Sequence, residues 1–217
     1  MASGFPASID SFTDPLAGSA LNSPSHSSQH ADLNSAVNKI ENYMGLVKVI
    51  PTSATNGTVG ATGTVIIGNA VSSVTVNNAF SSLYDNYKII YTNVNSSAND
   101  VLVQMTIGSP VSAYRFAQQV TTYATGSVLT FSVSGTGGVN FWNVGYTGTV
   151  NEMYSIIELQ SPFLTINKTI QANGGRNNAL ISMNGIVLDA VSRTNFTFTP
   201  ASGTLTGGSI RVYGYRN

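Results

Sequence analysis

Short apolar runs that alternate with polar residues dominate the chain from about residue 64 to its C-terminus. The alternation is clearest at 195–199 and 210–213, where Phe or an aliphatic residue occupies every second position. A period of two is typical of a half-buried β-strand. We expect strands at 64–67, 71–76, 87–92, 101–107, 128–133, 139–146, 153–159, 163–166, 179–188, 195–199 and 209–215. Because no helical pattern separates these runs, the sequence predicts a mainly β fold, with a jelly-roll-like antiparallel β-sandwich over 64–217.

Residues 23–48 have a different pattern, with apolar positions three or four residues apart, and they predict one helix. Ser23 is a suitable N-cap, Pro24 suits the first helical position, and Gly45 is a stop signal. The apolar positions form an a/d heptad seam, which consists of Leu33, Val37, Ile40, Met44 and Val47.

This narrow apolar stripe has two interpretations. Either the helix lies against its own globular domain, or it associates with copies of itself. The opposite face is polar, and β-branched residues at d positions, Ile40 and Val47, disfavour a parallel dimer relative to a bundle of three or four helices. We therefore expect a trimeric coiled coil over 23–48. About three heptads are too few to hold a bundle alone, so the rest of the chain must also associate.

Two segments without periodicity flank the predicted helix. Residues 1–22 are rich in Ser, Ala and Pro, which predicts an extended arm with little structure of its own. Such an arm either stays unstructured or becomes ordered when it docks on a partner. Its candidate anchor residues are Phe5, Phe12, Leu16 and Leu21. Residues 49–63 contain three glycines at period three and predict a flexible linker.

The composition narrows the classes of function. Only 8% of the 217 residues are charged, and the net charge is zero; a typical soluble domain has roughly 25% charged residues. A chain without a strong field does not attract polyphosphate, so we expect no nucleic-acid partner. No apolar run approaches the ~18 residues of a membrane span, so we expect no membrane insertion. The chain has no cysteine, which excludes disulfides and thiolate metal sites.

Residues suited to catalysis are sparse. The acids of the predicted sandwich are Asp85, Asp100, Glu152, Glu158 and Asp189. Only Glu152 and Glu158 are close in sequence, and on one strand their side chains would lie roughly 20 Å apart. That separation is too long for the carboxylate pair of a glycosidase. We therefore expect no enzymatic activity, no catalytic residues and no cofactor.

Both histidines, His26 and His30, continue the apolar stripe of the helix toward its N-terminus. In a parallel trimer, each would form a ring of three imidazoles that is able to hold a metal ion or an anion. The alternative, which we favour, is a polar plug at the end of the bundle, hydrogen-bonded to serine and water.

A candidate recognition site lies at 140–146, which holds the only tryptophan of the chain. Flat aromatic faces stack on the C–H face of a sugar, and amide groups hydrogen-bond to its hydroxyls. In a regular strand Trp142 and Tyr146 point to the same face. The candidate ligand-binding residues are Trp142, Tyr146, Asn140 and Asn143. The alternative is that Trp142 packs in the core or in a subunit interface, which is the commoner role of this residue type.

Several segments resemble structural proteins of tailed bacteriophages. Residues 23–37, followed by Ile40, Glu41 and Gly45, resemble the virion-proximal helix of minor tail and fibre proteins. The segments 83–89 (with the core YDNY), 161–164 and 199–215 resemble the β-rich distal domain of phage fibres. The resemblance implies a homotrimer that is anchored on the virion by its N-terminus and displays a β-domain to the host. It implies no set of ligand-binding residues.

We therefore expect a virion protein, a homotrimeric tail fibre or spike that binds other virion proteins through its N-terminus. Its sandwich would bind a glycan or protein on the host-cell surface. A capsid head fibre, decoration or adaptor protein that contacts only virion proteins is the alternative. A depolymerase of host polysaccharide is a further alternative, which the sparse carboxylates disfavour.

Overall fold

The computed structural model describes residues 26–43, 45–109, 111–123, 125–133, 138–150, 153–176 and 179–215. They belong to two units, one that contains the helix and one that spans Leu46–Tyr215. The predicted anchor residues Phe5, Phe12, Leu16 and Leu21 lie outside the described residues, and so does Met44 of the predicted seam.

The helix, α1, spans His26–Tyr43 and is shorter than predicted. Gly45 follows it with a φ of 82°, a left-handed conformation that glycine adopts without strain and that commonly ends helices. Val47 was predicted to lie on the helical seam, but it lies in the first strand and pairs with Gly214. The predicted end of the helix at 48 is therefore wrong, because β-branched residues after Gly45 complete a sheet instead.

The β unit contains sixteen strands in its described residues. They are β1 (Leu46–Val49), β2 (Ser53–Thr55), β3 (Gly57–Val59), β4 (Val65–Ile67), β5 (Val74–Asn77), β6 (Asn86–Ser96), β7 (Val101–Ile107), β8 (Tyr114–Thr122), β9 (Val128–Val133), β10 (Trp142–Thr147), β11 (Met153–Gln160), β12 (Lys168–Arg176), β13 (Ala179–Val187), β14 (Phe196–Pro200), β15 (Leu205–Thr206) and β16 (Ser209–Tyr215). The mainly β fold predicted from the sequence is confirmed.

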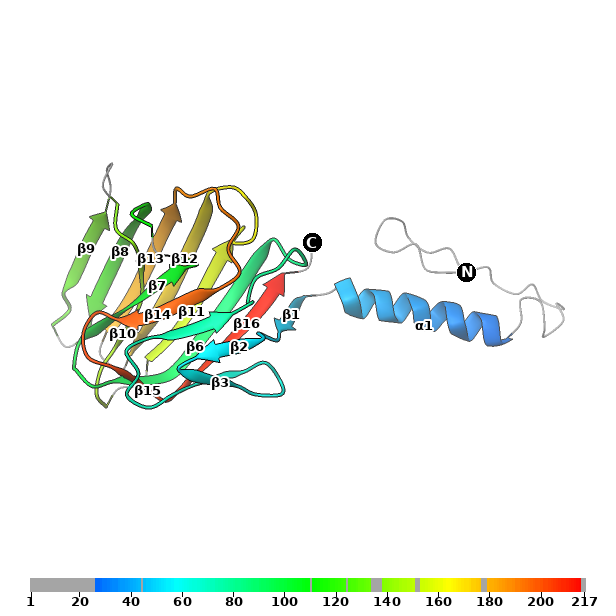
Figure 1. The fold of residues 1–217 in the computed structure, drawn as a ribbon, viewed down its shortest axis with the longest axis horizontal. Coiled ribbons are helices and arrows are strands. Elements are labelled where there is room, and N and C mark those ends of the chain that lie inside the picture. The colour runs from blue at the N-terminus through cyan, green and yellow to red at the C-terminus, as the bar shows by residue number, and fades with distance from the viewer. Residues whose placement is uncertain are drawn as a thin grey trace. The chain divides into compact units, whose positions relative to one another are not determined.

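The strands form two antiparallel sheets. The large sheet has the order β3-β4-β16-β6-β11-β12-β13-β8-β9, with β1 added beside β16 and β15 beside β6. The small sheet has the order β10-β7-β14-β5-β2. Strands of the two sheets run in different directions where they overlap in Figure 1. The chain therefore forms a sandwich of two antiparallel layers.

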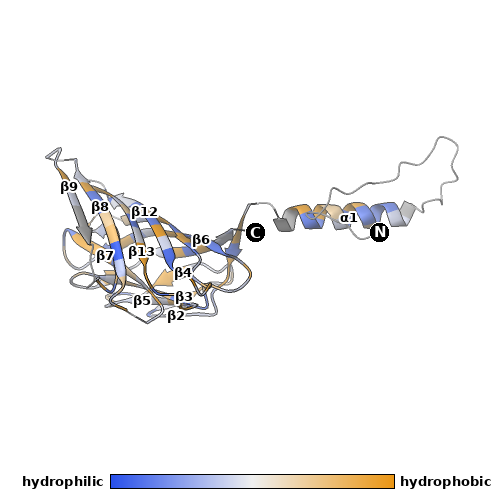
Figure 2. Ribbon diagram, turned by 90° about the horizontal axis from the view of Figure 1, so that it is seen from above, coloured by the Kyte–Doolittle hydropathy of each residue, from blue (hydrophilic) through white to orange (hydrophobic). Residues whose placement is uncertain are grey.

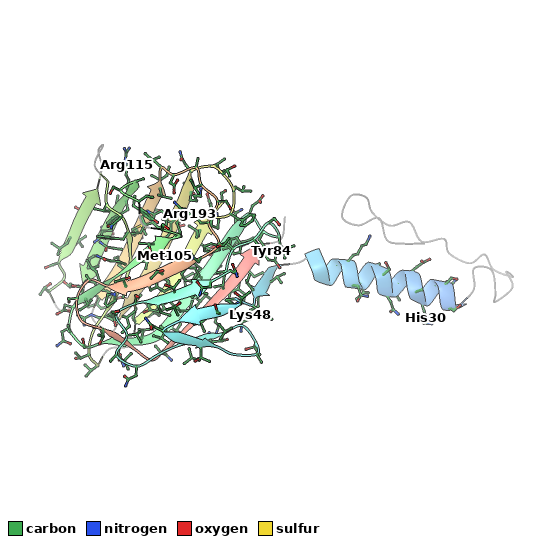
Figure 3. All side chains as sticks on the ribbon, viewed as in Figure 1. His30, Lys48, Tyr84, Met105, Arg115 and Arg193 are labelled. Carbon is green, nitrogen blue, oxygen red and sulfur yellow. The ribbon has the colours of Figure 1, made fainter. Side chains whose placement is uncertain are left out.

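The core lies between the two sheets. Tyr91 of β6 stacks on Phe198 of β14 with ring centroids 4.6 Å apart. Met105 of β7 is fully buried and lies in the interior that side chains fill in Figure 3. Burial of each large apolar side chain stabilises the fold by about 1.5–3 kcal/mol, so these inward rows hold the layers together. Strands of the β unit carry both hydrophilic and hydrophobic residues in Figure 2, and buried positions alternate with less buried ones along β7 and β16, as the period-two pattern predicts.

Three predictions of local structure differ from the observed strands. The predicted linker 49–63 contains β2 and β3 and belongs to the β unit. The segment 163–166 is no strand, because Leu164 N donates to Ser161 O and closes a turn. The pattern also missed β8 and β12, two strands of the large sheet.

Candidate functional site

Trp142, the centre of the predicted recognition site, is part of the core. Its side chain is fully buried, and Tyr114 of β8 meets it edge to face with ring centroids 4.5 Å apart. A Cβ added to Gly185 would lie 2.7 Å from Trp142 Nε1, so this glycine of β13 makes room for the indole. The prediction that Trp142 stacks on a ligand is wrong, and its alternative as a core residue is confirmed.

A β-bulge separates Tyr146 from Trp142. The pairing of β10 with β7 shifts between Asn143 and Gly145, so that one extra residue enters β10. Tyr146 consequently lies opposite Leu102, on the outward side, whereas Trp142 points inward. The prediction of a shared face is wrong for this reason. Tyr146 is half-buried, with the Arg176 guanidinium carbon 5.2 Å from its ring centroid.

The two predicted amide ligands are also separated. Asn143 is only 5% exposed, and its Nδ2 donates to Oε1 of Gln118 at 2.9 Å. Asn140 is exposed and precedes β10. The four predicted ligand residues therefore form no common exposed surface, because Trp142 and Asn143 are buried.

The two histidines and three residues of the predicted seam, Leu33, Val37 and Ile40, lie on the helix. His30 is exposed on α1, while the side chain of His26 is outside the described part. Among described residues, no group of three or more His, Cys, Asp or Glu side chains is placed to hold a metal ion. Of the seam, Leu33 is 54% exposed, Val37 44% and Ile40 42%.

The charged groups inside the β unit hold loops in place. Lys168 is fully buried, and its Nζ donates to the backbone oxygens of Ile166 and Asp189 at 2.5 and 2.7 Å. Burial lowers the pKa of Lys168, while the carboxylate of Asp189 acts in the opposite direction. Arg193 forms an ion pair with Asp189. This cluster ties the loop before β12 to the loop before β14, and it is structural.

The outward side of the large sheet brings polar side chains together. The registers place Asn173 opposite Ser182, and Ser182 opposite Gln119. In the adjacent row, Gln171 of β12 lies opposite Asn184 of β13. All five side chains are exposed. We call this surface the amide face, and it consists of Gln119, Gln171, Asn173, Ser182 and Asn184.

The side chains of the amide face have no hydrogen bond to other residues in the described part of the chain. Bonded polar groups begin at its border, where Thr169 Oγ1 donates to Gln160 Oε1 at 2.6 Å. Each amide offers two donors and an acceptor oxygen, and the serine hydroxyl offers one donor and an acceptor. The amide face is therefore a dense set of hydrogen-bonding groups that have no partner among the described residues.

An apolar border adjoins the amide face on β11 and β13. Tyr154 is 48% exposed, Ile156 43% and Leu180 37%. Ile156 lies opposite Asn173, so the border is directly beside the amides. Gly175 lies between Tyr154 and Leu180 in the registers, and the Leu180 side chain occupies the space that a side chain at Gly175 would fill.

Charged side chains on this side of the sheet lie on the strands that flank β12 and β13, and they include Arg115 of β8, opposite Ile186, and Arg211 of β16, opposite Ile90. Lys88 Nζ lies 2.9 Å from Glu158 Oε1, and the Tyr215 hydroxyl donates to Glu158 Oε2 at 2.5 Å. Burial raises the pKa of Tyr215 to about 12, and Glu158 acts in the same direction. The outward positions of β12 and β13 within the described ranges carry no charged residue.

The predicted ligand-binding residues did not include the amide face, although the sequence carries its signal. Apolar residues alternate with amides or serine at 170–173 and at 181–184, and the two segments pair as β12 and β13. Alternation of this kind predicts one buried side and one uncharged polar side. Pairing of the two strands, which brings the amides together, could not be deduced from the pattern.

Comparisons with known proteins assign no family. No protein-family model matches the chain, and no curated protein matches it. Among solved structures, peanut lectin with a nine-residue peptide is similar to this chain at 11% identity and a TM-score of 0.32. The similarity covers 78% of this chain and 97% of the lectin chain. At this TM-score it supports no argument about ligand or fold. No helix among the described residues is long and apolar enough to cross a membrane.

Proposed function

We propose that this chain is a structural protein of a tailed-bacteriophage virion, a homotrimeric tail fibre or spike. Its N-terminus would attach to other virion proteins, and its jelly-roll-like sandwich would bind the surface of the host cell. The observation that carries the proposal is the exposed apolar stripe of α1, formed by Leu33, Val37 and Ile40. The resemblance of residues 23–37 and 199–215 to phage fibre segments supports it.

The stripe has the spacing that helices use to pack on one another. Its positions are separated by four and three residues, which is the a/d spacing of a coiled coil. Burial of each side chain in a bundle would contribute about 1.5–3 kcal/mol. Because the helix has only 18 residues, we infer that the β units also associate in the trimer.

The character of the β unit supports a role in recognition. It carries an uncharged outward surface of amides, the amide face, with an exposed aromatic residue beside it. Such groups suit neutral, hydroxyl-rich molecules better than anions. The chemistry expected of a depolymerase is less well supported, because Glu158, Asp100 and Asp189 are each held in an ion pair.

The oligomeric state of the full chain tests the proposal most directly. We expect sedimentation equilibrium to give a trimer for the natural chain. The double variant Val37→Ser/Ile40→Ser should dissociate, because it makes the stripe polar. Asn34→Ser/Asn38→Ser is the matched control, since both asparagines are exposed on the same helix, and it should remain a trimer. A monomeric natural chain would contradict the proposal.

The place of the chain on the particle separates a fibre from a capsid decoration. Antibodies against the full chain, seen by electron microscopy on virions that contain it, should label the tail. Capsid labelling would favour the head fibre or decoration. Absence of the chain from every particle fraction would contradict a virion role.

A further inference from the structure

We propose that the amide face binds a neutral polysaccharide chain of the host surface. This inference rests on the proposed function and names the ligand class and the surface that carries it. The surface is the outward side of β8, β12 and β13 together with Tyr154 and Ile156 of β11. It replaces the site predicted around Trp142, in which Trp142 and Asn143 are buried.

The hydrogen-bonding groups form a regular array. Neighbouring strands of a sheet lie about 4.8 Å apart, and outward residues on one strand repeat every ~6.8 Å. Asn173, Ser182 and Gln119 form one row across three strands, and Gln171 and Asn184 begin the next row. Because the array extends over several strands, it can contact successive sugars of a chain rather than a single ring.

The donor and acceptor content of the array matches hydroxyl groups. A sugar hydroxyl both donates and accepts, and an amide side chain presents both functions at once. The amide-face side chains make no competing bonds among themselves or with other described residues. A ligand would therefore replace water at these groups and would not have to break an intramolecular network.

The apolar border provides the second feature of a sugar-binding surface, which is an exposed aromatic ring. The exposed ring of Tyr154 can stack on the C–H face of a sugar while the amides contact its hydroxyls. Asn173 lies opposite Ile156, one row from Tyr154, so apolar and polar groups meet along one line. Because Gly175 has no side chain, Leu180 of β13 extends over it and adds apolar surface in the same row as Tyr154.

The lack of charged residues on the amide face favours a neutral ligand. The outward positions of β12 and β13 in the described ranges carry no charge, and Glu158 at the border is paired with Lys88. An anionic polysaccharide would find no cation on β12 and β13, because the nearest arginines of this side, Arg115 of β8 and Arg211 of β16, lie outside the amide face. A protein partner would have to satisfy five closely spaced polar groups in a desolvated interface, where each unpaired group is costly.

The test measures binding of the full chain to an array of bacterial polysaccharides that has a neutral set and an anionic set. We expect binding to members of the neutral set. The triple variant Asn173→Ala/Ser182→Ala/Asn184→Ala should weaken that binding at least tenfold, and Tyr154→Ala should weaken it several-fold. All four side chains are exposed, so the variants should fold, and thermal unfolding checks this.

Two matched controls keep the test specific. Gln104→Ala removes an amide from the outward side of the small sheet, and Tyr123→Ala removes an exposed tyrosine outside the amide face. Both controls should bind as the natural chain does. The same panel is measured by sedimentation, because the amide face would be an interface between copies if the triple variant lost the trimer.

The outcomes distinguish this inference from the proposed function. If the natural chain binds neutral polysaccharides or bacterial cells and the triple variant binds equally well, the inference is wrong and the proposed function stands. Binding restricted to the anionic set, or loss of the trimer in the triple variant, also overturns the inference. If the natural chain binds neither polysaccharides nor cells, host binding itself is contradicted.

Discussion

Bonded polar pairs on the outward side of the small sheet contrast with the unbonded polar side chains of the amide face on the large sheet. On the small sheet two pairs of outward polar side chains are hydrogen-bonded, and in one of them the hydroxyls of Thr75 and Thr197 lie 2.8 Å apart. Asn77 Nδ2 donates to Ser53 Oγ at 3.1 Å on the same side. On the large sheet, Asn173 and the other side chains of the amide face form no hydrogen bond with the residues that the structure describes.

The difference indicates different roles for the two surfaces. Polar groups that satisfy each other contribute to the stability of the sheet that carries them. Exposed amides without partners contribute little to stability, because water solvates them equally well in the unfolded chain. A dense set of such groups is free to serve recognition. We therefore expect substitutions to separate a structural side from a binding side.

The largest effect on stability should come from a substitution in the core, between the two sheets. Trp142→Ala removes a fully buried side chain and should lower the free energy of unfolding by about 3–5 kcal/mol. Denaturant unfolding followed by circular dichroism measures the loss. If Trp142→Ala kept its stability and lost polysaccharide binding, the assignment of Trp142 to the core would be wrong.

A smaller effect on stability should distinguish the outward side of the small sheet from the amide face. Thr75→Val should cost about 1 kcal/mol, because it removes one hydroxyl of the Thr75–Thr197 pair. The double variant Thr75→Val/Thr197→Val should cost less than the sum of its single variants, since both act on one bond.

On the amide face, Asn173→Ala and Asn184→Ala should each change stability by no more than about 0.5 kcal/mol. Equilibrium unfolding in urea compares both sets under one condition. If Asn173→Ala and Asn184→Ala lowered the free energy of unfolding as much as Thr75→Val, the amides would be structural, and the contrast between the two surfaces would be wrong.

The sequence predicted the fold class well where alternation was regular. The segments 101–107, 128–133 and 209–215 were predicted with the bounds that the strands have. β8 was missed because Gln118 occupies an inward position, where it accepts a bond from buried Asn143. A polar residue on the buried side interrupts the apolar alternation. Its hydrogen-bond partner, Asn143, is distant in sequence, so the pattern does not reveal why a polar residue is buried there.

The site was less predictable than the fold for a related reason. Trp142 was judged by its residue type, but a bulge and the pairing of β10 decide which side it faces. β12 was missed since Asn173, Gly174 and Gly175 have the composition of a turn. The amide face depends on the pairing of β12 with β13 and of β13 with β8, and these registers follow from tertiary packing.

The smallest predicted effect is a pH-dependent change in stability, which comes from Tyr215 and its bond to Glu158 at the border of the amide face. The pKa of Tyr215 is about 12 in the folded chain, against an ordinary value of 10.0, because the hydroxyl is buried and bonded to Glu158. Between these two values the unfolded chain releases a proton that the folded chain keeps. The contribution of Tyr215 is therefore full below pH 10 and is lost as the pH rises toward 12.

Tyr215→Phe should remove this part of the pH dependence. The loss of stability from pH 10 to 12 should be smaller in the variant than in the natural chain, measured by denaturant unfolding at each pH. Tyr213→Phe, on the same side of β16, is the control and should retain the steeper loss. Since Glu158 also pairs with Lys88, Tyr215→Phe leaves the border charge neutralised and should not change polysaccharide binding at neutral pH. An unchanged pH dependence in Tyr215→Phe would mean that the Tyr215–Glu158 bond does not form in solution.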